Sequence, residues 1–423
     1  MSRRNLVAGA VAGAALAAVV GHVSGTSPTY AIALAAVPIF IALVFTSPGL
    51  IVAATLPAVF LTYRVGPASL NMSIADLALV CAIVVAFADR MTLGPTLSGM
   101  LRVVAAYQVL MLVVVAAHPT SPAITDWFHR AGLMVGGLLV GASIVRLGVL
   151  KHAMSMFVTT AAIYAAVAVE FGVTHGFAPA YPLGIHKNAA GSLLAMGIAT
   201  IATVPEGSGI PARLHRPLYV LLGAGLFATR SRGALVGLGV VLLVWALVQR
   251  GSSRLRGIAV LTAIVGAVFV WHSVQTEVRT DVNKLGALGT RQRQQAEAWK
   301  AFQSNTTLGA GIRYYDHNPA LAADGRPSSM IYEALAESGV VGTAGLALVI
   351  VGPLLLLRRG RSQWAVVGLA VFGAKAVHGL FDNLWVAGSF TLPWLILGIA
   401  AVKEFEFSSE PEPADDPALS PAQ

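Results

Sequence analysis

Continuous apolar runs of about 15 to 20 residues recur along most of the chain and restrict its fold more than any other feature. A helix of this length can cross the hydrocarbon core of a bilayer, where every backbone N–H and C=O must be hydrogen-bonded within the segment. Membrane β-barrels instead show alternating apolar and polar residues in segments of about ten. The pattern therefore predicts an all-α, polytopic integral membrane protein.

The composition excludes a soluble globular fold, because 56% of the residues are hydrophobic and only 11% are charged. The net charge of +9 does not indicate a nucleic-acid-binding protein, since the basic residues gather at the ends of apolar runs, where they determine membrane orientation. Cys81 is the one cysteine in the chain, so a disulfide framework and a thiolate metal site are both excluded within one chain.

The apolar runs number about fourteen, which predicts about 12 to 14 transmembrane helices. They lie at about 6–23, 29–46, 49–63, 73–89, 98–117, 131–148, 153–173, 189–204, 216–229, 232–249, 257–272, 339–357, 363–380 and 388–402. Arg3 and Arg4 precede the first run, which we interpret as a retained helix with its N-terminus in the cytoplasm. With this start most Lys and Arg residues fall on the cytoplasmic side, and the long polar interval 271–338 faces outward. The short outer loops then hold few basic residues, namely Arg64, Arg130, Lys187, Arg230 and Arg232.

Four regions follow from this topology. Residues 1–272 are predicted to form the N-terminal transmembrane helices, 273–338 an extracytoplasmic catalytic loop, and 339–402 the C-terminal transmembrane helices. Residues 403–423 are acidic and rich in proline and serine, which predicts a disordered cytoplasmic tail.

Inside the long loop, residues 290–305 are predicted to form an amphipathic helix that lies on the membrane surface. Ala296, Trp299 and Phe302 recur there at helical spacing, with arginines and glutamines on the opposite face. Arg291 lies near the start of this helix, where the helix dipole does not favour a cation. This position favours a role for Arg291 other than helix stability.

Two arginines on the outer side, Arg230 and Arg232, separate a pair of apolar runs. Guanidinium groups on the side that is poor in cations indicate an anionic ligand, and arginine forks match phosphate oxygens in a bidentate way. We therefore expect this pair to bind a diphosphate, although a lone arginine at a membrane edge more often only extends to the interface. Lys187, in a His-Lys-Asn cluster, is compatible with a polar helix start or with substrate contact.

His317 and Glu337 are the candidates for acid–base chemistry. A histidine beside carboxylates, as His317 is beside Asp316, can act as a general base near neutral pH, and a loop histidine without a role is equally compatible with the sequence. Glu333 and Glu337 are four residues apart and share one helix face before the next apolar run. They can pair with loop arginines or complement the helix dipole.

Four motifs, in this order, resemble the O-antigen ligase and polymerase superfamily of bacterial envelope glycan enzymes. They are TRSRGALVGLGVVLL at 229–243, the Arg291 helix with the G-x-G turn at 309–311, EALAESGVVG at 333–342, and HGLFDNLW at 378–385. The resemblance covers residues 181–400, and the N-terminal half is similar only in spanning the membrane several times.

The resemblance implies a metal-independent, inverting glycosyltransferase of the cytoplasmic (inner) membrane that needs no cofactor. It implies transfer of a glycan from a polyprenyl (undecaprenyl) diphosphate carrier to an acceptor hydroxyl of a glycan or lipid, with membrane lipids and no nucleic acid as partners. By position, Arg232 and Arg291 correspond to the diphosphate-binding arginines, which would stabilise charge on the leaving group. Further candidates for diphosphate binding are Arg230, Arg313 and Lys187.

The chain departs from the family's pattern at the expected base. Members of the family carry His-Asn or His-Ser eleven residues before the first glycine of the G-x-x-G motif, whereas Ser328 and Ser329 stand there in this chain. A serine hydroxyl is a poor base. We predict His317 as the base, with Asp316 or Glu337 as the next candidates. The alternatives are that the chain has lost or relocated the base, or that it uses the site differently.

Three other functions remain open at this point. A polymerase that joins lipid-linked repeat units differs from a ligase only in its acceptor. A transporter or flippase of lipid-linked glycans is favoured by Lys375 and His378, which lie in an apolar run, but no inverted repeat is evident. A non-catalytic partner of a glycan assembly machine is compatible with Ser328.

Overall fold

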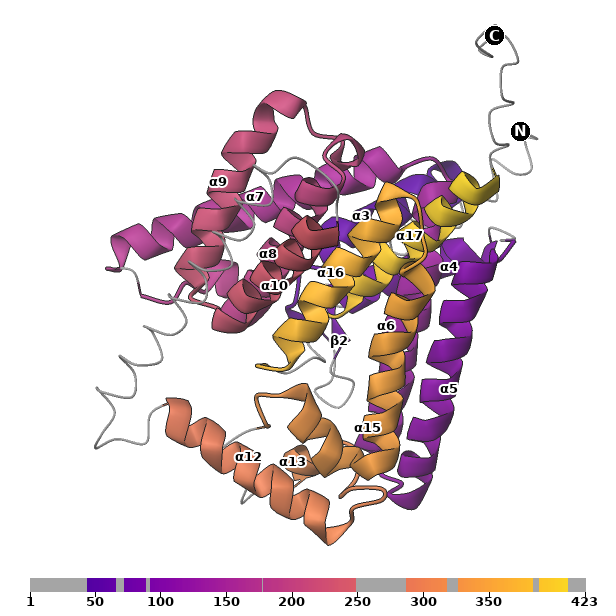
Figure 1. The fold of residues 1–423 in the computed structure, drawn as a ribbon, viewed down its shortest axis with the longest axis vertical. Helices are drawn as coiled ribbons and strands as arrows, with labels where there is room; N and C mark the ends of the chain where they lie inside the picture. The colour runs from indigo at the N-terminus through magenta and orange to yellow at the C-terminus, as the bar shows by residue number, and fades with distance from the viewer. Residues whose placement is uncertain are drawn as a thin grey trace, which may run out of the picture. The chain divides into compact units, whose positions relative to one another are not determined.

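The computed structural model describes most of the chain, namely residues 44–65, 72–88, 92–176, 178–248, 287–317, 326–382 and 388–409 (Figure 1). The chain divides into two units, Met1–Ile51 and Val52–Gln423, each defined by contacts among its own residues. Only residues 44–51 of the first unit are described, and they include the start of helix α3 (Pro48–Ala58). All features discussed below belong to the second unit.

Helices account for nearly all of the described structure. Their bounds are α4 (Ile74–Ala88), α5 (Pro95–Ala117), α6 (Ser121–Arg146), α7 (Leu150–Thr174), α8 (Lys187–Thr203), α9 (Ala212–Thr229), α10 (Arg232–Val248), α12 (Ala287–Ser304), α13 (Tyr314–His317), α15 (Met330–Leu357), α16 (Gln363–Gly379) and α17 (Thr391–Ser409), with 3-10 turns at Pro182–Gly184 and Glu206–Ser208. The one sheet within the described ranges is an antiparallel hairpin of β1 (Arg64–Val65) and β2 (Met72–Ser73). The predicted all-α fold class is confirmed.

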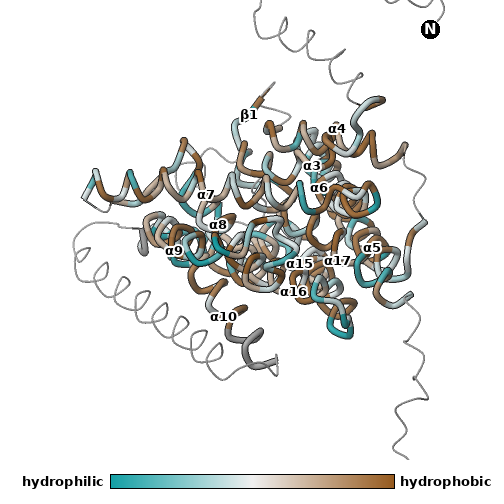
Figure 2. Tube along the Cα trace, turned by 90° about the horizontal axis from the view of Figure 1, so that it is seen from above, coloured by the Kyte–Doolittle hydropathy of each residue, from teal (hydrophilic) through white to brown (hydrophobic). Residues whose placement is uncertain are grey.

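Four of the described helices, α5, α6, α7 and α15, are long and apolar enough to cross a membrane. The helices α3 and α4 and the first part of α10 are shorter and also apolar, and Figure 2 shows hydrophobic residues along most of the helical chain. The chain is therefore a polytopic membrane protein, as predicted. The total of about 12 to 14 transmembrane helices stays a prediction, because the apolar runs before residue 44 and at 257–272 lie outside the described residues.

Glycines determine the close crossing of α6 and α17. A Cβ on Gly141 of α6 would overlap the carbonyl oxygen of Leu395, and a Cβ on Gly398 of α17 would overlap the carbonyl oxygen of Leu138. Small residues let helix backbones approach closely, which is how helices associate inside a membrane. The helix α6, which carries part of the site described below, is thereby fixed against its neighbour.

Helix α6 begins ten residues before the apolar run that the sequence predicts at 131–148. Thr120 caps this earlier start, because its side-chain oxygen accepts a hydrogen bond of 3.2 Å from the backbone N–H of Ala123. Arg130, predicted to lie in a short outer loop, is instead buried on the helix and is 6% exposed. The prediction was wrong because it assumed that a charged residue ends an apolar helix, whereas here the charge is paired inside the protein.

Helix α17 continues to Ser409, seven residues into the segment that was predicted to be a disordered tail. Two interactions hold this extension. Lys403 and Glu406 form an ion pair of 2.7 Å, and the carboxylate of Glu404 accepts hydrogen bonds of 2.9 Å from the backbone N–H groups of Arg361 and Ser362, before the start of α16. The remaining predicted tail, 410–423, lies outside the described residues.

The predicted amphipathic helix at 290–305 is present as α12. Its buried face consists of Ala298 and Ala301, which pack near Ala336 of α15. The side chain of Trp299 is 47% exposed, and its ring lies 5.2 Å from that of Phe302. The alanines of α12 thus pack against α15. Contact of the larger side chains, Trp299 and Phe302, with a membrane surface stays a prediction.

Candidate functional site

Helix α15 is broken at Gly339, where φ is 59° and ψ is −155°. Side chains are essentially excluded from this backbone conformation, so it requires glycine. The segment 306–311 supplies hydrogen bonds to the backbone groups on both sides of the break. These are Ala310 N–H to Ala336 O at 2.8 Å, Gly311 N–H to Glu337 O at 3.0 Å, Val340 N–H to Thr306 O at 2.9 Å and Val341 N–H to Thr307 O at 3.1 Å.

Gly309 and Gly339 meet backbone to backbone at this break. A Cβ on Gly339 would lie 2.5 Å from the carbonyl oxygen of Thr307, and a Cβ on Gly309, whose φ is 70°, would overlap the backbone nitrogen of Ser338. Two glycine motifs that the sequence singled out separately, the turn at 309–311 and the step at 339–342, are therefore halves of one structure. We call this contact the glycine interlock, defined by Gly309 and Gly339.

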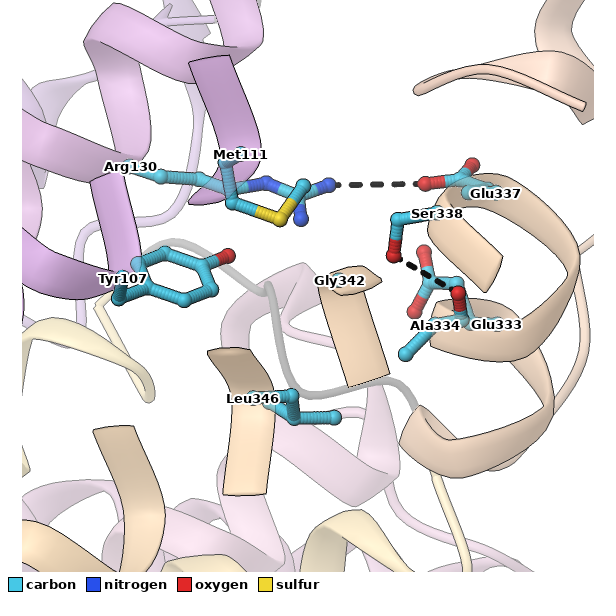
Figure 3. A pocket seen from close by; sticks show the side chains of 9 residues that line it. All are labelled: Tyr107, Met111, Arg130, Glu333, Ala334, Glu337, Ser338, Gly342 and Leu346. Carbon is cyan, nitrogen blue, oxygen red and sulfur yellow. Dashed lines mark hydrogen bonds and ion pairs between the residues drawn. The ribbon is translucent and has the colours of Figure 1, made fainter. Parts of the chain in front are cut away.

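The glycine interlock places Glu337 opposite Arg130 of α6 (Figure 3). The guanidinium Nη2 of Arg130 lies 3.6 Å from Glu337 Oε2, and both side chains are buried. The hydroxyl of Tyr107 also lies beside the Arg130 guanidinium. Glu337 Oε1 has no hydrogen-bond partner among the described residues. A cavity of about 10 Å³ lies next to this carboxylate, which is room for about one water molecule.

Glu337 belongs to a larger set of charged side chains, which we call the ion network. Its closest contacts are Arg130–Asp126 at 2.6 Å, Asp126–Arg313 at 3.2 Å, Arg313–Asp316 at 2.9 Å, Asp316–Arg326 at 2.6 Å and Arg326–Glu333 at 3.2 Å. The network joins α6, α13 and the start of α15. Four carboxylates and three guanidinium groups give it a formal charge of −1, so the network favours hydrogen-bond donors over anions.

Mutual pairing keeps the part of the network outside the membrane helices charged. Burial raises the pKa of Asp316, but hydrogen bonds and charge from Arg326, followed by charge from Arg313, hold the pKa below its usual value. Burial lowers the pKa of Arg326, and this is outweighed by Glu337, Glu333 and Asp316, which raise it. These residues therefore act as fixed charges near neutral pH, whereas the unpartnered oxygen of Glu337 is available to bind a proton donor.

A second group of charged residues gathers where α8, α10 and α16 meet. A Cβ on Gly191, one turn into α8, would lie 2.5 Å from Ser231 Cβ, and a Cβ on Gly233 would lie 2.6 Å from Cδ2 of His378. These contacts bring together the helix starts that carry Lys187 and Arg232. Both starts present the positive end of a helix dipole, which favours an anion.

Buried polar groups of α16 complete this second group. Lys375 is 3% exposed and donates a hydrogen bond of 3.1 Å to Ser389 Oγ. His378 lies one turn further along the helix, and its Nε2 is 3.6 Å from Asp382 Oδ2. We call Lys187, Arg232 and Lys375 the basic cluster. The carboxylate of Asp382, which contacts His378, is one negative charge beside these three cations, so the formal charge of this group is opposite in sign to that of the ion network.

The remaining predicted site residues have different surroundings. Arg230 is exposed and ends α9 with φ of 51°, and Arg291 is exposed on α12. Helix α12 packs against α15, whereas α10 packs mainly against α8 and α16, so joint binding of one diphosphate by Arg232 and Arg291 stays a prediction. Arg313, with φ of 65°, is held by two carboxylates of the ion network.

The two candidate bases of the loop are placed as follows. His317 is the last residue of α13, and its side chain lies outside what the structure describes. Ser328, at the position where the resemblance predicts histidine, donates a hydrogen bond of 3.4 Å to Gln294 Oε1. Gln294 lies one helical turn after Arg291 on α12, so position 328 contacts the helix that carries a predicted diphosphate ligand.

Sequence reasoning missed Asp126, Arg130 and Arg326. The spacing of Asp126 and Arg130, four residues apart before an apolar run, is the signal that could have indicated a paired, helical start of α6. Arg326 lies in a polar loop segment where no local pattern distinguishes it.

Comparisons with known proteins bear on residues 217–347, which match the family model described as O-antigen ligase. A search of curated proteins found no match. The matched stretch contains Arg232, Arg291 and Glu337, together with both glycines of the glycine interlock. The resemblance drawn from the motifs is thus confirmed over residues 217–347, which are similar to the O-antigen ligase family and hold three of the four motifs.

Proposed function

We propose that the protein is a membrane glycosyltransferase of the O-antigen ligase type. It transfers a glycan from a polyprenyl-diphosphate carrier to an acceptor hydroxyl at the outer face of the cytoplasmic membrane. The observation that supports this most is the buried Glu337, which lies in the stretch matched by the family and which the glycine interlock positions against Arg130 of α6. A buried carboxylate with one unpartnered oxygen beside a cavity has the features of a general base.

In the proposed reaction, Glu337 removes the proton from the acceptor hydroxyl. The acceptor oxygen attacks the anomeric carbon, and the bond between this carbon and the diphosphate oxygen breaks. The electron pair of that bond leaves with the polyprenyl diphosphate, and attack from the opposite face inverts the anomeric configuration. Arg130 orients the Glu337 carboxylate, and His317 is the alternative base.

The basic cluster is the proposed site of the diphosphate. Its two helix starts and the cations of Lys187, Arg232 and Lys375 would stabilise the negative charge that develops as the diphosphate leaves. Arg291 and Arg230 are further candidates for contacts with the same group, and Arg313 is bound by carboxylates instead. This division separates an anion site from a proton-accepting site, as a transfer from a diphosphate to a hydroxyl requires.

The test uses purified protein in nanodiscs, a polyprenyl-diphosphate-linked glycan and candidate acceptors, with formation of the transferred glycan as the readout. We expect Glu337→Gln to lower the rate by about 10²- to 10⁴-fold, the usual contribution of a general base, with donor binding retained. Glu297→Gln is the matched control, because Glu297 forms an ion pair with the exposed Lys300 on the same helix, α12. Equal rates for the two variants would rule out Glu337 as the base.

The choice of acceptor in this assay separates the related functions. Product formed on a lipid-linked repeat unit identifies a polymerase, and product formed on a different glycan or lipid identifies a ligase. Movement of the donor across the bilayer without transfer identifies a flippase and overturns the proposal.

A further inference from the structure

A groove of about 250 Å³ lies between α4 and α6 and shares no lining residue with the cavity beside Glu337. Most of its wall is apolar and includes Leu79, Ile83 and Phe128. Gly132 also lines it, and a Cβ at this position would meet no atom within 4 Å. The volume lies just below the range of about 300–1,000 Å³ found for small-molecule sites, which suits a single apolar chain.

Two ionisable side chains, Asp76 and His129, lie in the wall of this apolar groove. Asp76 is 3% exposed, and its Oδ2 accepts hydrogen bonds from the backbone N–H and the hydroxyl of Ser73, at 2.7 and 2.9 Å. His129 Nε2 lies 3.3 Å from the same oxygen. The two hydrogen bonds from Ser73 orient the carboxylate, and Asp76 Oδ1 and His129 Nε2 are both left without a hydrogen-bond partner among the described residues.

The free oxygen of Asp76 indicates a ligand. Oδ1 is buried and has no hydrogen-bond partner among the described residues. Buried polar atoms are normally paired, because leaving one unpaired destabilises the protein. A hydrogen-bond donor on a ligand in the groove would satisfy this oxygen.

The charge of Asp76 selects among possible ligands. A carboxylate accepts hydrogen bonds from hydroxyl groups and repels phosphate, so the head group is rich in hydroxyls and not anionic. His129 is also adjacent in sequence to Arg130, which contacts Glu337. One turn of α6 therefore contributes His129 to the groove and Arg130 to the ion network.

We propose that the groove between α4 and α6 binds the acceptor of the transfer reaction, an amphiphile with an apolar chain and a hydroxyl-bearing head. The apolar chain lies along Leu79, Ile83 and Gly132, and the head donates a hydrogen bond to Asp76 Oδ1. This inference deepens the proposed function, and the identification of the ligand as the acceptor rests on that function. The binding site itself is defined by the groove and by Asp76, and it can be tested without any transfer reaction.

The experiment is photo-crosslinking of the full chain in phosphatidylcholine nanodiscs. The probes are a long-chain alkyl glucoside with a diazirine at the end of its chain, and an alkyl phosphate with the same chain and diazirine. We expect the glucoside to label α4 and α6, and we expect Gly132→Leu to lower this labelling by at least about tenfold, because its side chain occupies space otherwise filled by the ligand chain. Gly223→Leu is the matched control, since a Cβ on this helical glycine of α9 also meets no atom within 4 Å.

Asp76→Asn tests the recognition of the head group. We expect it to reduce the preference for glucoside over phosphate by about tenfold, because the charge that repels phosphate is lost. Equal labelling in Gly132→Leu and Gly223→Leu, labelling outside α4 and α6, or preferential labelling by the phosphate probe in the wild type would each overturn the proposal. Specific labelling by a protein that transfers no glycan would instead support the groove and refute the proposed function.

Discussion

Replacement of Gly339 by alanine tests whether the glycine interlock holds the site together. The new side chain faces two obstacles, a backbone conformation that alanine avoids and the carbonyl oxygen of Thr307, which lies 2.5 Å from the position of its Cβ. The conformational strain costs about 1–3 kcal/mol. Moving the loop to relieve the contact also breaks the hydrogen bonds from Val340 and Val341, at roughly 1 kcal/mol each.

Together these effects predict that Gly339→Ala lowers the free energy of unfolding by roughly 3–5 kcal/mol. Gly223→Ala is the control, because the same change in an open, helical position is expected to be stabilising by about 0.5–1 kcal/mol. Thermal unfolding of both variants in the same detergent, followed by tryptophan fluorescence, measures the difference. If Gly339→Ala melts at the wild-type temperature or above it, the glycine interlock does not have the role described here.

Two further predictions concern charged groups. Arg326→Ala removes the cation that contacts the buried Glu333 and one of the two cations that contact Asp316, so we expect a loss of about 3–5 kcal/mol. Lys300→Ala removes an exposed pair and should cost at most about 1 kcal/mol. Equal melting temperatures for the two variants would contradict the structural role of the ion network. Glu404→Ala removes two hydrogen bonds at the start of α16 and should cost about 1 kcal/mol at neutral pH. Burial raises the pKa of Glu404, but hydrogen bonds from the backbone N–H groups of Arg361 and Ser362 outweigh this effect, so the pKa lies below its usual value in the folded protein. The extra stability of the wild type over Glu404→Ala is therefore fully present above about pH 4.3, the usual pKa of a glutamate in an unfolded chain, and is lost as the pH falls through the pKa of Glu404 in the folded protein. A difference in melting temperature that persists in acid would refute this assignment.

The helices could be predicted from apolarity wherever a run was not interrupted by charge. The predicted runs 153–173, 189–204, 216–229 and 363–380 match α7, α8, α9 and α16 to within a few residues. The start of α6 could not be found in this way, because Asp126 and Arg130 are balanced by partners distant in sequence. Hydropathy along one segment contains no information about such partners.

The candidate site was predictable in its parts and not in its assembly. Glu337 and the two glycine motifs were identified from the sequence, because glycine turns and paired acids have local signatures. Their arrangement depends on contacts between segments separated by up to about 200 residues, such as that of Arg130 with Glu337. The groove at Asp76 was missed because its two polar residues lie on separate helices and each is ordinary in its own segment.

The backbone of residues 306–311 completes the hydrogen bonding of a membrane helix, although the segment looks like a loop in the sequence. Surface loops usually tolerate inserted residues and are common sites for epitope tags and circular permutation. An insertion here would shift the register of four backbone hydrogen bonds and so disturb a helix more than twenty residues away along the chain. Protein engineers who need an accessible insertion point should therefore treat this segment as part of helix α15.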